Sequence, residues 1–174
     1  MTVPTVAPTG VERFFEDDEI IVSKTDVQGR ITYANDVFQR ISGFTEAELL
    51  GASHNIVRHP DMPRSVFQLL WDTIEDGREI FAYVVNLANN GDHYWVLAHV
   101  TPTFDGDGTI VGYHSNRRVP DRGAVEKASE LYRQLLLEEE RHPNRKQGIE
   151  AATALLSDLL ASQGIEYDAF AFSL

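Results

Sequence analysis

The sequence lacks cysteine, is poor in basic residues and contains no long apolar run, and each absence excludes a class of protein. Without cysteine, the chain has no disulfide, no thiolate nucleophile and no cysteine-held zinc or haem. Its 15 Lys and Arg residues against 27 Asp and Glu residues give a net charge of −12, which argues against nucleic-acid and anionic-membrane partners. No apolar run approaches the roughly 20 residues of a bilayer span, and the first residues lack a signal-peptide pattern. We therefore expect a cytoplasmic protein without direct membrane insertion.

The sequence does contain a dense group of ionisable side chains between His54 and Pro63. Two His, one Arg and one Asp lie between positions 54 and 61, and Pro60 and Pro63 fix the backbone there. An irregular segment of this kind, lying between a strand pattern and an apolar helix, is a typical place for a binding site. The plain alternative is a solvated loop in which Asp61 caps the following helix.

The residue pattern predicts two strands, a helical middle, three further strands and a helical end. Strands are expected over residues 20–25, 31–34, 80–87, 93–102 and 109–115, and helices over residues 36–41, 45–48, 65–74, 121–141 and 147–162. Strands grouped around a helical middle indicate an α+β fold with one antiparallel sheet, not alternating βαβ units. The sequence contains neither a GxGxxG motif nor a phosphate loop, so it gives no support for the usual nucleotide sites.

The two ends of the chain differ in composition from its centre. Residues 1–17 are expected to form an N-terminal cap or flexible segment, with a helical turn or cap at Val11–Phe15. In residues 121–174, two amphipathic helices separated by Pro143 predict an antiparallel helical hairpin, followed by an apolar tail. This hairpin is too small to bury its apolar stripes alone, so we expect it to pack on the sheet or on a second copy. It is therefore a candidate for homodimerisation or partner docking.

Three segments of the sequence together resemble the PAS domain of bacterial aerotaxis receptors. They are Asp26-Val-Gln-Gly-Arg-Ile-Thr-Tyr-Ala-Asn35, Asn55-Ile-Val-Arg-His-Pro-Asp-Met-Pro63 and Asn90-Gly-Asp-His-Tyr-Trp95. The first segment is shared by PAS domains of many functions and indicates the fold only, whereas the second is narrower and points to the subgroup that binds FAD. The resemblance covers about residues 18–118 and suggests a PAS sensor domain over residues 18–120.

The resemblance implies a five-stranded antiparallel sheet, with short helices on one face, whose concave side holds FAD noncovalently. Family positions important for FAD match Arg58, His59 and Asp61, and three more candidates fall on matching positions. The full set of candidate cofactor residues is Asn35, His54, Arg58, His59, Asp61, Phe67, Trp71, Asn86 and Arg117. Phe67 and Trp71, one helical turn apart, would form a wall of the site or simply belong to the core.

The chemistry of these side chains suits a flavin. The ring system needs an apolar slot with a few convergent donors, and Asn86 offers both a donor and an acceptor. Arg58 and Arg117 suit either the phosphates or a reduced, anionic ring. The sequence departs from the family where Ile80, with Phe81 beside it, replaces a Trp near the flavin. A stacking partner is therefore either missing or supplied by another residue.

The resemblance implies a non-enzymatic sensor of redox or oxygen status that resembles the free-standing version of the family. Such a sensor would signal to a chemotaxis receptor or histidine kinase. The alternatives are a cofactor-free docking module and a haem-binding gas sensor with an axial histidine. A metal site of His54, His59 and Asp61, a flavin oxidoreductase and a blue-light receptor are weaker alternatives. The absence of cysteine excludes the flavin–cysteine adduct and leaves only photoreduction for the last of these.

Overall fold

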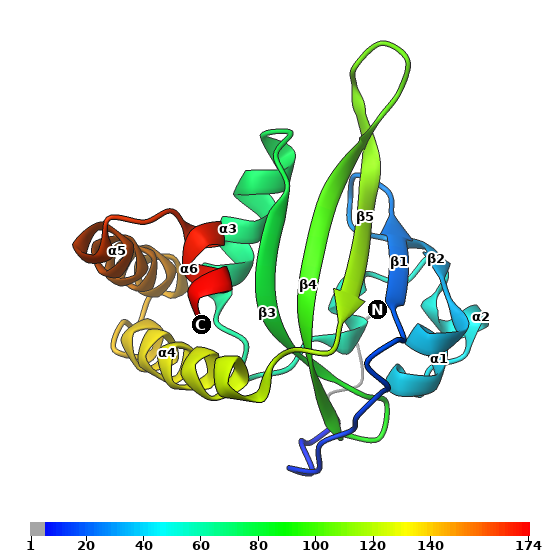
Figure 1. The fold of residues 1–174 in the computed structure, drawn as a ribbon, viewed down its shortest axis with the longest axis horizontal. Coiled ribbons are helices and arrows are strands. Elements are labelled where there is room, and N and C mark those ends of the chain that lie inside the picture. The colour runs from blue at the N-terminus through cyan, green and yellow to red at the C-terminus, as the bar shows by residue number, and fades with distance from the viewer. Residues whose placement is uncertain (1–5) are drawn as a thin grey trace.

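A five-stranded antiparallel sheet in the order β2-β1-β5-β4-β3 forms the centre of the computed structural model, which describes residues 6–174 (Figure 1). The strands are β1 (Ile21–Thr25), β2 (Ile31–Ala34), β3 (Ile80–Leu87), β4 (His93–Phe104) and β5 (Ile110–Arg118). The helices are α1 (Asp36–Ser42), α2 (Glu46–Leu49), the short 3-10 helix η1 (His54–Val57), α3 (Arg64–Glu75), α4 (Arg122–Glu140), α5 (Arg145–Gln163) and α6 (Tyr167–Ser173). The predicted α+β class and the five-stranded PAS-type sheet are confirmed.

Local sequence signals account for the short helices beside β1 and β2. Asn35 caps α1 by accepting a hydrogen bond from the backbone N–H of Phe38. Thr45 and Glu48 form the predicted capping box of α2. The turn between β1 and β2 contains Gly29 at a φ of 76°, a left-handed conformation that favours glycine.

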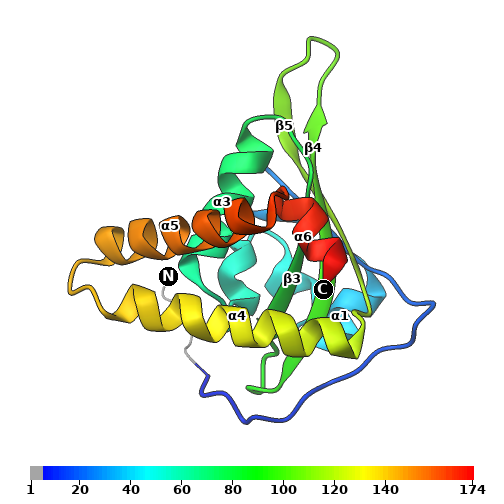
Figure 2. The ribbon, with the colours of Figure 1, turned by 60° about the vertical axis from the view of Figure 1, so that its left-hand side comes forward.

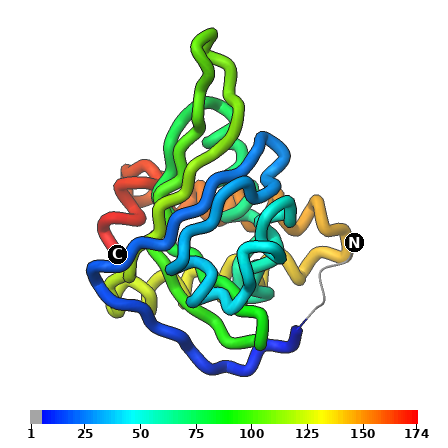
Figure 3. Tube along the Cα trace, turned by 90° about the vertical axis from the view of Figure 1, so that its right-hand side faces the viewer, coloured from blue at the N-terminus to red at the C-terminus, as the bar shows by residue number. Residues whose placement is uncertain are grey.

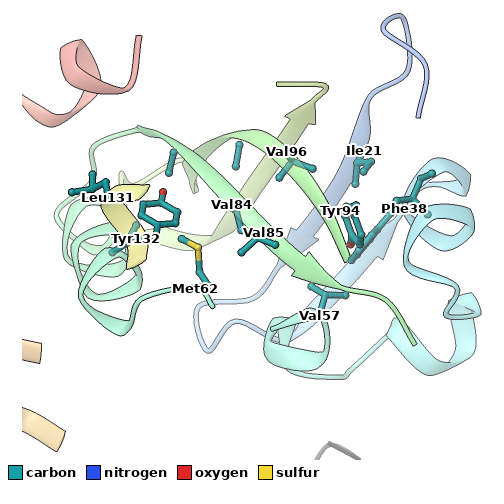
Figure 4. Packing of buried hydrophobic residues seen from close by; sticks show 14 of the residues in the cluster. Ile21, Phe38, Val57, Met62, Val84, Val85, Tyr94, Val96, Leu131 and Tyr132 are labelled. Atoms are coloured by element: carbon teal, nitrogen blue, oxygen red, sulfur yellow. The ribbon is translucent and has the colours of Figure 1, made fainter. Parts of the chain in front are cut away.

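Side chains alternate between the two faces of the sheet, and each face is covered by different helices. Val84 of β3 and Ala98 of β4 face η1 and α3 on the concave side. The loop that contains η1 packs there too: its Val57 and Met62 belong to the same buried cluster as Val84 (Figure 4). The concave face is therefore roofed by helices that precede β3 in the chain.

The C-terminal helices wrap around the β3 edge of the sheet (Figure 2). On the opposite face, Tyr132 of α4 stacks on Trp95 with ring centroids 6.1 Å apart. Helix α5 lies against both α4 and α3, and Leu131, Leu135 and Leu156 of the hairpin are buried in the main core. The hairpin is confirmed, and its apolar stripes pack on this chain's own sheet and α3. The residues that sequence reasoning treated as an apolar tail form the additional short helix α6.

Strand β3 is an edge strand, yet several of its outward backbone groups have partners outside the sheet. The N–H of Phe81 donates to Oδ1 of Asp168 in α6 at 3.2 Å, and the carbonyl of Tyr83 accepts a hydrogen bond from the hydroxyl of Tyr132 at 2.5 Å. Further along the strand, Asn86 forms an isolated antiparallel bridge with Arg58. The free edge is thus closed by two helices and a loop.

The N-terminal segment adds an extended stretch beside the start of β4 (Figure 3). Thr9 N–H donates to the carbonyl of Gly91 at 2.9 Å, and Arg13 N–H donates to the carbonyl of His93 at 2.7 Å. The predicted helical turn at Val11–Phe15 is therefore wrong, because these backbone groups bond to the sheet instead. Residues 1–5, the start of the segment predicted to be flexible, lie outside the described residues.

Candidate cofactor-binding site

A cavity lies between the concave face of the sheet, helix α3 and the loop His54–Pro63, called the cavity loop below. Six of the nine candidate residues line it, and these are His54, Arg58, Phe67, Trp71, Asn86 and Arg117. Apolar side chains such as Leu70, Ile74 and Val84 form much of the remaining wall. Among the described residues that line it, none is acidic, although the whole chain carries a net charge of −12.

Backbone contacts hold the cavity loop in place at both ends. The N–H of His54 donates to the carbonyl of Gly29 at 2.9 Å, and Arg58 bridges to Asn86 of β3. Facing residues of an antiparallel pair direct their side chains to the same face, so the bridge brings Arg58 and Asn86 to the cavity together. The loop is thus anchored to the sheet, although Asn55, Pro60 and Asp61 remain exposed. Asp61 does not cap α3, whose N-cap position is Pro63.

A chain of hydrogen bonds fixes the polar end of the cavity. Nη2 of Arg117 donates to Oγ of Ser23 at 2.5 Å, and the same oxygen lies 3.1 Å from Nε2 of His54. Burial and the nearby charge of Arg117 lower the pKa of His54 to about 3. His54 is therefore neutral, which leaves its Nε2 free to accept a hydrogen bond from the Ser23 hydroxyl.

Several buried polar atoms of the cavity lining lack partners among the described residues. Arg117 is 2% exposed, and its Nε and Nη1 have no hydrogen-bond partner among residues 6–174. Nδ2 of Asn86, on a residue that is 4% exposed, is likewise unpartnered in the described structure. Burial lowers the pKa of Arg117 to about 10, so the guanidinium remains charged at neutral pH. A buried cation with free donors and no acidic neighbour in the cavity is suited to an anionic ligand.

Arg58 also lines the cavity, and its guanidinium lies over the ring of Phe67. Its guanidinium carbon is 3.9 Å from the ring centroid of Phe67, and Nη2 donates to the carbonyl of Met62 at 3.2 Å. Burial, together with the nearby charge of Arg64, lowers the pKa of Arg58 to about 10. The cavity therefore presents a second cation, held in position by its own loop and by α3.

An aromatic pair forms another part of the cavity wall. Trp71 and Tyr113 meet edge to face with ring centroids 5.5 Å apart. Ile80, at the position where the family resemblance leads us to expect a Trp, is 2% exposed and packs with this pair. Phe81 points to the other face, where it stacks on His99. Trp71 and Tyr113 therefore supply the aromatic surface that Ile80 and Phe81 do not.

Three candidate residues do not line the cavity. Oδ1 of Asn35 accepts hydrogen bonds from the N–H of Phe38 in α1 and from the N–H of Val22 in β1. Its Nδ2 donates to the carbonyl of Ile20, just before β1. His59 is 5% exposed, and its Nδ1 accepts a hydrogen bond from the N–H of Asp61 at 3.0 Å. The Asp61 side chain is 78% exposed. These residues shape α1 and the cavity loop, and direct cofactor contact by any of them stays a prediction.

Sequence reasoning missed several lining residues. They are Ser23, Thr25, Asn55, Tyr113 and Ser115, together with apolar residues of β3, β4 and α3. Strand alternation carried a usable signal, because Tyr113 and Ser115 share the face of Arg117.

The described residues give no support for a metal centre. Between residues 6 and 174 no group of three or more His, Asp and Glu residues is placed to hold a metal ion. Of the two histidines in the cavity loop, His54 lines the cavity and His59 does not. Over the same residues, no helix is long and apolar enough to cross a membrane.

Known proteins of related sequence are signalling proteins. The chain is 43% identical over 119 residues to the aerotaxis receptor of Escherichia coli, an alignment that covers 68% of this chain and 23% of the receptor. It is 29% identical over 103 residues to the nitrogen fixation regulatory protein of Klebsiella pneumoniae, covering 59% and 21% of the two chains. The biofilm dispersion protein BdlA of Pseudomonas aeruginosa is 30% identical over 88 residues, covering 49% and 21%. The chain thus spans less than a quarter of the length of these relatives.

Solved structures support the same fold. The light-state structure of the blue-light photoreceptor Aureochrome1 LOV superposes with a TM-score of 0.57 at 22% identity, over 63% of this chain and 88% of that one. The light-state dimer of the fungal blue-light photoreceptor Vivid gives 0.53 at 21% identity, over 62% and 82%. Identities this low speak for the fold alone. The family model of the PAS fold matches residues 31–117, half of the chain, and the chain therefore belongs to the PAS fold family.

Proposed function

We propose that the chain is a cytoplasmic sensor that binds FAD noncovalently in the cavity and responds to redox or oxygen status. The observation that carries the proposal is the buried Arg117, whose free donors and lack of an acidic neighbour in the cavity suit an anionic ligand. A flavin combines a flat apolar ring system with anionic phosphate, which matches an apolar cavity containing two cations. The 43% identity to the E. coli aerotaxis receptor supports the same conclusion.

The residues of the cavity divide the work of holding such a cofactor. Arg58 and Arg117 would bind its negative charge, whether on the phosphates or on the reduced ring. Asn86 would offer its amide Nδ2 to a ring carbonyl or nitrogen, and Trp71 with Tyr113 would pack on the ring. A bound flavin supplies a ring that accepts and releases electrons, with a change in charge. Arg117 and Asn86 are the groups best placed to respond to that change.

We further propose that the response is passed to a chemotaxis receptor or a histidine kinase and that the chain turns over no substrate. Its relatives include an aerotaxis receptor and a nitrogen fixation regulatory protein, and the hairpin offers the chain a surface for a partner or a second copy. The signal would then be a change in association rather than a released product.

The deciding experiment is an absorption spectrum of the purified protein in air and after dithionite. The proposal expects the two broad flavin bands in air and bleaching on reduction. If the protein is purified without cofactor, it should take up FAD on incubation, and a parallel incubation with flavin mononucleotide tests which flavin it prefers. A sharp Soret band would instead assign the cavity to haem, and a colourless protein that takes up neither flavin would leave a cofactor-free docking module.

Arg58→Ala separates the sensor from the docking module. A sensor should lose FAD while its circular dichroism is unchanged. Arg58 supplies a positive charge to the cavity, and within the fold its side chain contacts the Phe67 ring and the carbonyl of Met62. Arg78→Ala removes an exposed arginine that does not line the cavity and should retain FAD. Steady oxidation of NAD(P)H above that of free flavin would contradict the non-enzymatic part of the proposal.

A further inference from the structure

The N-terminus of α3 is capped by a side chain from another helix. Its own N-cap position is Pro63, which makes no side-chain cap hydrogen bond. Instead, Oε1 of Glu139 in α4 accepts hydrogen bonds from the backbone N–H of Ser65 at 2.8 Å and from its Oγ at 2.9 Å. The first N–H groups of a helix need an acceptor, and a carboxylate is favoured there by the helix dipole. The position of α3 is therefore tied to the C-terminal hairpin.

Three helices meet at this carboxylate. Glu139 is 5% exposed, and its Oε2 has no hydrogen-bond partner in the part of the chain that the structure describes, with Nη1 of Arg64 3.9 Å away. Helix α5 packs closely at the same level, because a Cβ added to Gly148 would collide with the carbonyl oxygen of Glu139. A change in the position of α3 cannot be absorbed locally at such a tightly packed junction.

The other side of α3 is a wall of the cavity. Phe67 and Trp71 line the cavity, and the guanidinium of Arg58 rests on the Phe67 ring. Burial lowers the pKa of Arg58, whereas the charge of Glu139 acts in the opposite direction. Glu139 thus affects the cavity through both α3 and a charged lining residue.

We propose that Glu139 is a positioning residue that couples the cavity to the α4–α5 hairpin through the first turn of α3. The proposal rests on the proposed function in one respect, namely that a ligand in the cavity displaces or stiffens α3. By linkage, the hairpin must then influence ligand affinity as strongly as the ligand influences the hairpin. A partner that binds the hairpin would read the state of the cavity by this route.

The first experiment needs no cofactor. Amide hydrogen exchange is compared between the wild-type protein and Glu139→Ala. Loss of the carboxylate should accelerate exchange roughly tenfold or more in residues 64–71 as well as in residues 136–150, since hydrogen bonds to charged groups contribute strongly. Glu139→Gln keeps an acceptor for Ser65 and should restore most of the protection in residues 64–71. Acceleration confined to the hairpin would overturn the proposal.

The second experiment adds FAD. Binding should slow exchange in residues 64–71 and in the hairpin of the wild-type protein, whereas in Glu139→Ala only residues 64–71 should respond. Glu138→Ala is the matched control, because Glu138 pairs with Arg141 and His142 at the surface of the same helix turn and should behave as wild type. Hairpin protection that persists in Glu139→Ala would contradict the coupling. If the wild-type protein takes up no FAD, the proposed function fails, and the cofactor-free comparison alone decides the role of Glu139.

Discussion

Arg117 is the residue at which stability and function oppose each other most clearly. A buried guanidinium with two free nitrogens is unfavourable for the cofactor-free fold, even though Nη2 bonds to Ser23 and the Phe38 ring lies 4.4 Å from its guanidinium carbon. A structural arginine would be paired with a carboxylate, and none lines this cavity in the described part of the chain. The unfavourable burial is thus concentrated at the proposed binding site, as is common for functional residues.

Replacing Arg117 with Met should therefore abolish FAD binding without weakening the cofactor-free protein. Met keeps most of the volume and removes an unpaired buried charge, so the free energy of unfolding should stay within about 1 kcal/mol of wild type or rise. Urea unfolding of cofactor-free protein measures this, with Arg118→Met as the control at the exposed neighbouring position. A loss of more than about 2 kcal/mol would mean that Arg117 is structural.

His54 should make stability depend on pH. Its pKa is about 3 in the folded chain against an ordinary value of 6.5, so below pH 6.5 the unfolded chain binds a proton that the folded chain does not. Stability should therefore fall as the pH is lowered from 6.5 towards 3, by about 2 kcal/mol between pH 6.5 and 5.

Urea unfolding of cofactor-free protein between pH 7 and 5 tests this dependence. Burial also lowers the pKa of His59, so the contribution of His54 is the difference between the wild-type protein and His54→Gln. The slope of the variant against pH should be smaller by about one proton than that of the wild-type protein. Equal slopes in the wild-type protein and His54→Gln would argue against a neutral His54 in the folded chain.

At the scale of elements, the turn between β1 and β2 supports the aromatic wall. Gly29 has a φ of 76°, and a Cβ placed there would lie 3.0 Å from Cη2 of Trp71. Gly29→Ala should destabilise the protein by about 1–2 kcal/mol and shift the fluorescence of Trp71, because strain and contact act together.

Gly108→Ala is the matched control for this prediction. Gly108 has a φ of 80°, but among residues 6–174 nothing lies within 4 Å of a Cβ added there. It should therefore show the backbone strain alone, and the difference between the two variants in urea unfolding gives the contribution of the Trp71 contact. Identical fluorescence and stability changes in both variants would rule out that contact as a support of the wall.

Elements with local signals were predictable from the sequence, and those fixed by distant contacts were not. The capping box of α2 and the span of β3 follow from neighbouring residues and are confirmed. Helix α6 has no side-chain cap and forms where the chain returns to β3, so nothing local distinguishes it from an apolar tail. The extended pairing of residues 9–13 likewise depends on a strand about 80 residues further along the chain.

The same difference between local signals and distant contacts applies to the candidate site. Its ionisable residues stand out in the sequence, and the resemblance selects a segment that lines the cavity in part. Residue type alone did not separate Arg58, which enters the cavity, from His59, which turns away from it. That difference is set by the bridge between Arg58 and Asn86, a pairing across 28 positions. The cap from Glu139 to Ser65 spans 74 positions and has no sequence signal at all.

At the scale of the whole molecule, the sheet and the C-terminal helices should unfold as one unit. Leu135 is fully buried in the cluster that also contains residues of β3 and the cavity loop, so Leu135→Ala should cost about 2–5 kcal/mol. Tryptophan fluorescence and far-ultraviolet circular dichroism should report the same lowered midpoint.

The control for this prediction lies on the same helix. Leu137 is 47% exposed, and Leu137→Ala should change the free energy of unfolding by about 0.5 kcal/mol or less. Two separate transitions, with the helical signal lost first, would show that the hairpin is an independent appendage.

The closed edge of β3 has a consequence for the protein in solution. The eight residues Ile80–Leu87 carry no charge, no proline and no glycine, and they are rich in β-branched and aromatic side chains. Such a segment is typical of those that stack into amyloid-like fibrils when their backbone is free to pair with another chain. Asp168, Tyr132 and the cavity loop occupy that backbone. The C-terminal helices therefore keep the backbone of β3 from pairing with another chain. Substitutions that detach these helices should lower the solubility of the protein before they abolish its fold.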